Sequence, residues 1–65
     1  MTIEMALKGI NICLDGKKRL VENLRTEYAK YPEDMITGLC NTLLDVLETD
    51  IEFLAQVKNQ ITQLE

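Results

Sequence analysis

The fold of this chain is decided by residues 36–64, ITGLCNTLLDVLETDIEFLAQVKNQITQL, in which one set of positions recurs at alternating steps of four and three. Such steps place side chains along one face of an α-helix, so the stretch predicts a long amphipathic helix that packs against other helices. One acid, Asp50, interrupts the apolar set. The predicted stripe consists of Ile36, Cys40, Leu43, Leu47, Asp50, Leu54, Val57, Ile61 and Leu64.

The first half of the chain repeats this rhythm, with one ionic interruption at Lys17. Thr2 is placed to cap a helix, and Glu4 lies in the first turn, where the helix dipole favours an acid. The dipeptide Asp15-Gly16 often forms a turn, but the rhythm passes through it unchanged, and a glycine inside a helix costs only about 1 kcal/mol. We therefore expect one continuous helix over about 3–30. Its stripe consists of Ile3, Leu7, Ile10, Leu14, Lys17, Val21, Leu24, Tyr28 and Tyr31, widened by Ala6, Cys13 and Leu20.

Pro32 marks the boundary between the two helices. Proline disfavours helical backbone at the preceding residue and fits the first turn of a new helix. We predict a turn at 31–32 and a second helix over about 33–64. Because so short a connection forces the helices to run antiparallel, residues 1–65 are expected to form a single helical-hairpin domain.

The two ionic interruptions fall in neighbouring layers of this hairpin. Lys17 is expected opposite Leu47, and Asp50 opposite Leu14. The offset is one helical turn, about 5 Å. We predict that Lys17 and Asp50 form an ion pair, within one chain or between two chains.

Further apolar residues flank the stripe of 36–64 on both sides, and one partner helix cannot cover a surface so wide. At about 25 cal/mol per Å², leaving these side chains partly in water forfeits several kcal/mol, which is comparable to the whole stability of a domain this small. We therefore predict an all-α fold in which two hairpins assemble into a homodimeric four-helix bundle. The predicted oligomer interface consists of Leu39, Leu44, Val46, Ile51 and Phe53.

Composition and charge are those of a small globular protein. No apolar run approaches the ~20 residues that cross a bilayer, and no secretory leader is apparent, so a cytoplasmic location is expected. Cys13 and Cys40 are then expected to stay reduced and to face the core. The net charge is −4, with six basic and four acidic residues in 1–31 but one basic and seven acidic residues in 32–65. This asymmetry favours antiparallel pairing of the helices.

No catalytic constellation is present, since the chain has no histidine, no serine and no Cys-x-x-Cys motif. We expect no enzymatic activity, no cofactor and no metal. Asp45, Glu48 and Glu52 have the spacing of a carboxylate metal site, but they fall on the outer face of the predicted helix. A solvated acidic face is the expected interpretation.

A narrow second strip on the first helix is a candidate patch for another protein. Its glycines lack a Cβ and would let a foreign helix approach closely. The alternative is a weakly polar surface with incidental glycines. The strip consists of Met5, Gly9, Ile12 and Gly16.

The basic residues Lys18, Arg19 and Arg25 are candidate contacts to nucleic-acid phosphates. The cluster is spread around the helix and the pI is about 4.7, so a solvated basic face is the default. Nucleic acid is therefore an unfavoured partner, and no membrane partner is expected.

These features predict architecture in more detail than function. We expect a small non-enzymatic module for protein–protein interaction or regulation that acts as a helical-bundle dimer. One alternative is a subunit or chaperone partner of a hetero-oligomeric complex, in which a foreign helix covers the flanking apolar residues. The other is a small nucleic-acid-binding dimer that uses the basic face of the first helix.

Overall fold

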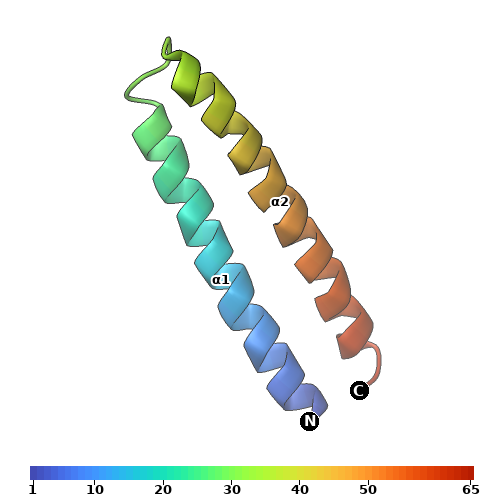
Figure 1. Ribbon diagram of the computed structural model, residues 1–65. Helices are drawn as coiled ribbons and strands as arrows, with labels where there is room; N and C mark the ends of the chain where they lie inside the picture. Colours follow the sequence, from blue (N-terminus) through green and yellow to red (C-terminus); the bar gives the residue numbers. More distant parts are fainter.

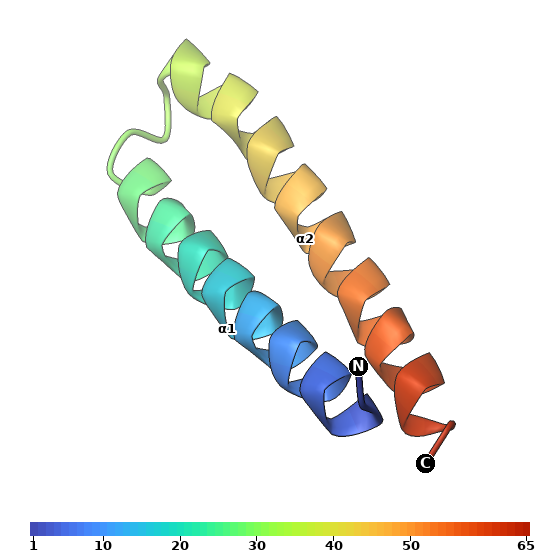
Figure 2. The same cartoon turned by 60° about the horizontal axis from the view of Figure 1, so that its bottom comes forward.

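The protein is an antiparallel hairpin of two helices, α1 (Ile3–Tyr28) and α2 (Met35–Thr62), in a computed structural model that describes residues 1–65 (Figure 1). The connection lies at one end of the hairpin, and both termini lie at the other. The hairpin is a rod with extents of 48 × 15 × 14 Å. In a second view no further segment covers either broad side of the helix pair (Figure 2). Neither α1 nor α2 contains a segment that could span a lipid bilayer.

α1 begins where its cap predicts. The Thr2 hydroxyl oxygen accepts a hydrogen bond from the Met5 N–H at 3.1 Å, which satisfies one of the free donors of the first turn. The helix runs without a break through Asp15-Gly16, as predicted. It ends at Tyr28 rather than near residue 30, and the Ala29 N–H donates to the Arg25 carbonyl at 3.0 Å.

The connection is longer than the predicted turn at 31–32, because residues 29–34 all lie outside the helices. Part of the difference comes from the end of α1 at Tyr28, and the rest comes from Asp34. Its carboxylate accepts a hydrogen bond from the Ile36 N–H at 2.7 Å, so Asp34 is the N-cap and α2 starts one residue later. Pro32 therefore lies in the connection and not in the first turn of α2.

The longer connection changes which residues of the two helices face each other. Lys17 lies opposite Asp50 and not opposite Leu47, with 3.3 Å between the Lys17 Nζ and an Asp50 carboxylate oxygen. Tyr28 packs against the cluster that contains Leu44 and Leu47, farther along α2 than Ile36, which the short turn would have set opposite it. The hairpin register is therefore displaced by about one helical turn from the predicted one.

The core lies in the middle of the hairpin, where Val21 of α1 packs against Leu44 and Leu47 of α2. Leu24, Tyr28 and Ile51 are partly buried against this cluster, and Leu14 is buried nearer the termini.

Placing Leu44 and Ile51 on an outward flank of α2 is wrong, because Leu44 is only 7% exposed and Ile51 packs beside it. Conversely Leu43, expected in the core, is 47% exposed, and Ile36 and Leu64 are also exposed. α2 is rotated so that Ile51 points inward and Asp50 moves to the edge of the contact. This rotation keeps the Asp50 carboxylate in reach of water and so avoids the cost of burying a charge.

The cap at Asp34 gives a direct test of the observed α2 boundary. Asp34→Ala is expected to lower the free energy of unfolding by about 1 kcal/mol, because one helix N–H loses its partner. Glu33→Ala, a change of the neighbouring acid outside the helix, is the matched control and should stay within about 0.5 kcal/mol of the parent. Urea unfolding followed by circular dichroism at one protein concentration measures both. If the two variants lose equal free energies of unfolding, Asp34 is not the N-cap and α2 starts at another residue.

Candidate interaction surface

Two ion pairs between the helices divide the hairpin into two sides. Lys17 pairs with Asp50, and Arg25 pairs with Glu48. Residues 48 and 50 are about 200° apart around a helix, so these pairs lie on opposite flanks of the core contact. Glu48, expected on the solvated outer face with Asp45 and Glu52, instead turns toward α1.

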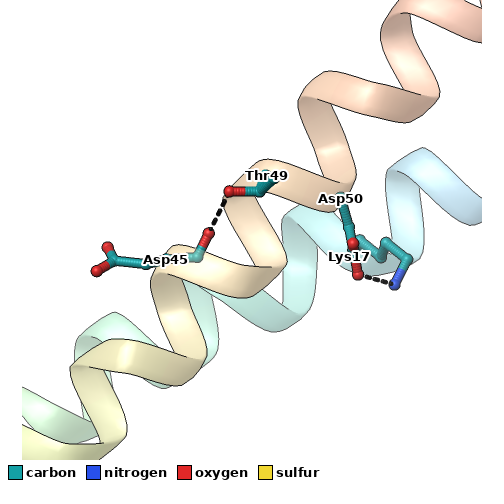
Figure 3. A network of polar contacts seen from close by, with 4 residues as sticks. All are labelled: Lys17, Asp45, Thr49 and Asp50. Atoms are coloured by element: carbon teal, nitrogen blue, oxygen red, sulfur yellow. Dashed lines mark hydrogen bonds and ion pairs between the residues drawn. The ribbon is translucent and has the colours of Figure 1, made fainter.

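The Lys17–Asp50 pair is a side-chain hydrogen bond of 3.3 Å at the edge of the core (Figure 3). The two side chains are 35% and 50% exposed, so water still reaches both charges. A pair this exposed contributes only about 0.2–1 kcal/mol. The Asp45 carboxylate points away from this pair, while its carbonyl oxygen accepts a hydrogen bond of 2.9 Å from the Thr49 hydroxyl.

A row of exposed apolar side chains runs along α2 on the same flank as Asp50. The steps between its members are three and four residues, with Asp50 taking one position between Val46, 54% exposed, and Phe53, 63% exposed. A row at this spacing is the surface that one helix presents to another. We call it the exposed stripe, and it consists of Ile36, Leu39, Leu43, Val46 and Phe53.

α1 adds apolar surface to the same side of the hairpin. Cys13 and Leu20 lie four residues before and three residues after Lys17, so they share its flank, and both are exposed. The expectation that Cys13 faces the core is wrong, whereas Cys40 is partly buried. The side carrying the exposed stripe and these two residues is the apolar side. The side with Arg25 and Glu48 is the polar side.

Only part of the predicted oligomer interface is available on this surface. Leu39, Val46 and Phe53 are exposed, and Leu44 and Ile51 belong to the hairpin core. Ile36 and Leu43, both predicted in the core stripe, are exposed beside them. The step pattern 36-39-43-46-50-53 was the available signal, but it overlaps the core pattern at several positions.

The glycine strip of α1 lies on the outer face of the hairpin. Met5 and Ile12 are exposed, and a Cβ added at Gly9 or Gly16 would meet no atom within 4 Å. No element of this chain packs on the strip, so its use by a partner stays a prediction.

The three candidate nucleic-acid contacts have different surroundings. Lys18 is exposed, and the Arg19 Nε donates to the Asp15 carbonyl at 3.4 Å. Arg25 is held by Glu48, whose carboxylate balances its charge. Phosphate binding by this face stays a prediction, and no group of three or more Cys, Asp or Glu side chains gathers as metal ligands would.

Tyr28 and Cys40 meet across the helices near the connection. A hydrogen-bonding contact with the Cys40 side chain raises the pKa of the Tyr28 hydroxyl, and desolvation adds to the shift in the same direction. Both effects favour the neutral phenol.

The chain matches no protein-family model, no curated protein and no solved structure. The features of this chain that bear on function are therefore the apolar side and the Lys17–Asp50 pair within it.

The Lys17–Asp50 pair is testable by a double-mutant cycle. Lys17→Asp and Asp50→Lys should each lower the free energy of unfolding, and the double variant should recover part of the loss, giving a coupling energy of about 0.2–1 kcal/mol that falls with added salt. A parallel cycle of Lys18→Asp with Asp50→Lys is the control, with a coupling energy near zero. Additive effects in the first cycle would mean that the two charges do not interact.

The Tyr28 pKa predicts how stability depends on alkaline pH. Because the folded-state pKa lies above the unfolded value, the stabilising contribution is present below the unfolded pKa of about 10 and is lost as pH rises through the folded pKa. In a Tyr31→Phe background, which leaves Tyr28 as the single tyrosine, phenolate absorbance should show a lower Tyr28 pKa after Cys40→Ala. An unchanged pKa would exclude Cys40 as the cause.

Proposed function

We propose that this protein is a small non-enzymatic module for protein–protein interaction or regulation, and that it works as a helical-bundle dimer. The observation that carries the proposal is the exposed stripe of α2. A row of large apolar side chains at heptad spacing, open to water on one flank of a helix, is a surface suited to packing against further helices.

The surface area of the hairpin supports association. A compact monomer of 7.4 kDa exposes about 4,200 Å², whereas this hairpin exposes 5181 Å². The excess is about 1,000 Å², close to the roughly 800 Å² that each partner contributes to a standard protein interface. The Cα radius of gyration of 15.1 Å leads to the same conclusion, because a compact domain of this length has about 11 Å.

The positions of the apolar surfaces on α2 fit a four-helix bundle. In such a bundle each helix contacts two neighbours on adjacent faces. α2 has two such faces, since Leu44 and Leu47 point to α1 while Leu39 and Val46 point to the apolar side. α1 covers the first of these faces within the hairpin, and a second pair of helices would cover the other.

The same surface would also suit the hetero-oligomeric alternative, in which a helix of a different protein covers the exposed stripe. The molar mass of the purified chain in solution distinguishes the homodimer from the hetero-oligomer. A homodimer has twice the chain mass of 7.4 kDa without any other protein present.

Sedimentation equilibrium of the pure chain is therefore expected to give a dimer at micromolar concentration. Val46→Lys should weaken the dimer at least about tenfold in Kd, since it places a charge in the middle of the exposed stripe. Gln56→Lys adds the same charge on the outer face of α2 and should leave the Kd unchanged. A well-folded monomer at all concentrations would refute the homodimer and favour a foreign partner.

A further inference from the structure

The Lys17–Asp50 pair interrupts the apolar side at the place where a second hairpin would pack. Asp50 takes a position in line with the exposed stripe, and Lys17 lies between Cys13 and Leu20 on α1. Both charged groups are only partly hydrated in the single hairpin, because 35% of the Lys17 side chain and 50% of the Asp50 side chain are exposed. Covering them with apolar side chains would be costly, so an apolar partner surface does not fit here.

A second copy offers the complementary charges, and its orientation decides whether they meet. We infer that two hairpins pack through their apolar sides around a two-fold axis parallel to the helices. This inference rests on the dimer proposed above. In this arrangement α2 of one copy lies against α1 of the other, and Asp50 faces Lys17 of the second copy.

The reason is that rotation about an axis parallel to the helices keeps every residue at its own height along the bundle. Lys17 and Asp50 are at the same height, because they bond across the hairpin. The two copies then bring two lysines and two aspartates together in a ring of alternating charge. Each carboxylate gains a second cation, which offsets the water it loses.

The apolar neighbours also match in this arrangement. Val46 lies one turn from Asp50 toward the connection, at the height of Leu20, and Phe53 lies one turn the other way, at the height of Cys13. The smaller Val46 therefore meets the larger Leu20 of the second copy, and the larger Phe53 meets the smaller Cys13. This pairing alternates large and small side chains, which favours close packing.

The other two-fold arrangement has its axis perpendicular to the helices and stacks α2 on α2. With the axis at the height of the ion pair, it sets Asp50 against Asp50 and Lys17 against Lys17. With the axis moved along the helix to Val46, Asp50 comes to the height of Thr42 of the second copy, beside Leu43, and gains no cation. Charge complementarity therefore favours the parallel axis.

The two arrangements differ in where the helix connections lie. A parallel axis puts both connections at the same end of the bundle, about 10–14 Å apart, which is the distance between neighbouring or diagonal helices of a bundle. A perpendicular axis puts them at opposite ends, separated by nearly the 48 Å length of the hairpin.

Spin labels measure this difference. In a Cys13→Ala, Cys40→Ala background with unchanged helix content, Glu33→Cys carries a label in the connection. Thr49→Cys carries one at mid-height, where both arrangements give a short distance. Short distances at both positions support the parallel axis. A short distance at 49 with a distance near 48 Å at 33 overturns it and leaves the proposed dimer intact. If neither position gives an intermolecular distance, the dimer itself is refuted.

A mixing experiment tests the ring of charges with both native cysteines in place. Asp50→Lys alone brings four positive charges together in the dimer, and Lys17→Asp alone brings four negative charges together. Each variant is expected to dimerise at least tenfold more weakly than the parent, and an equimolar mixture should recover dimer, because two of the four neighbouring contacts become attractive. If the mean molar mass of the mixture equals the average of the values for the two separate variants, no mixed dimer has formed. That result overturns the proposed orientation.

Discussion

The packing of Val21 against Leu44 and Leu47 is the contact on which the rest of the hairpin depends. It sets the rotation of α2 about its own axis, and that rotation decides which of the many apolar residues of this helix meet α1 and which meet water. With Leu44 and Ile51 turned inward, the row from Ile36 to Phe53 is left on one flank. A different rotation would bury Leu43 and Asp50, and the carboxylate would lose much of its hydration.

The two ion pairs have different structural roles, because one lies on the polar side of the hairpin and the other on the apolar side. Arg25 and Glu48 border the polar side, where solvated charges on a helix pair need no further partner. Lys17 and Asp50 border an apolar side, where they interrupt a surface that otherwise has heptad spacing. Polar groups at such positions add little to stability, and their best-attested effect in helical assemblies is to restrict register and orientation.

Small size connects these features to the proposed function. Only Leu14, Val21, Leu44 and Leu47 are buried in the single hairpin, and a core this small gives marginal stability. Association through the apolar side would extend the core without lengthening the chain. In the proposed dimer the folding of the hairpin would be coupled to its assembly.

The sequence by itself determined the helical hairpin. The steps of four and three, the Thr2 cap and the break near Pro32 are local features, and each specifies helix or connection through contacts within a few residues. The pairing of Lys17 with Asp50 is also predictable from the sequence, because the two residues interrupt their stripes at similar distances from the break. The sequence also indicates more apolar residues on the second helix than one contact can cover, but it does not indicate which of them stay exposed.

Only the tertiary structure decided the rotation and register of α2. The apolar arc of this helix is wider than one contact, so periodicity alone allows several faces toward α1, and a shift of one residue exchanges Leu43 for Leu44. The choice depends on the Asp34 cap, which lengthens the connection to residues 29–34, and on the cost of burying Asp50. The cap is a local contact, but the packing of Val21 on Leu44 and Leu47 and the position of Asp50 beside Lys17 join residues distant in the chain. For that physical reason the exposed face of α2 could not be predicted from local spacing.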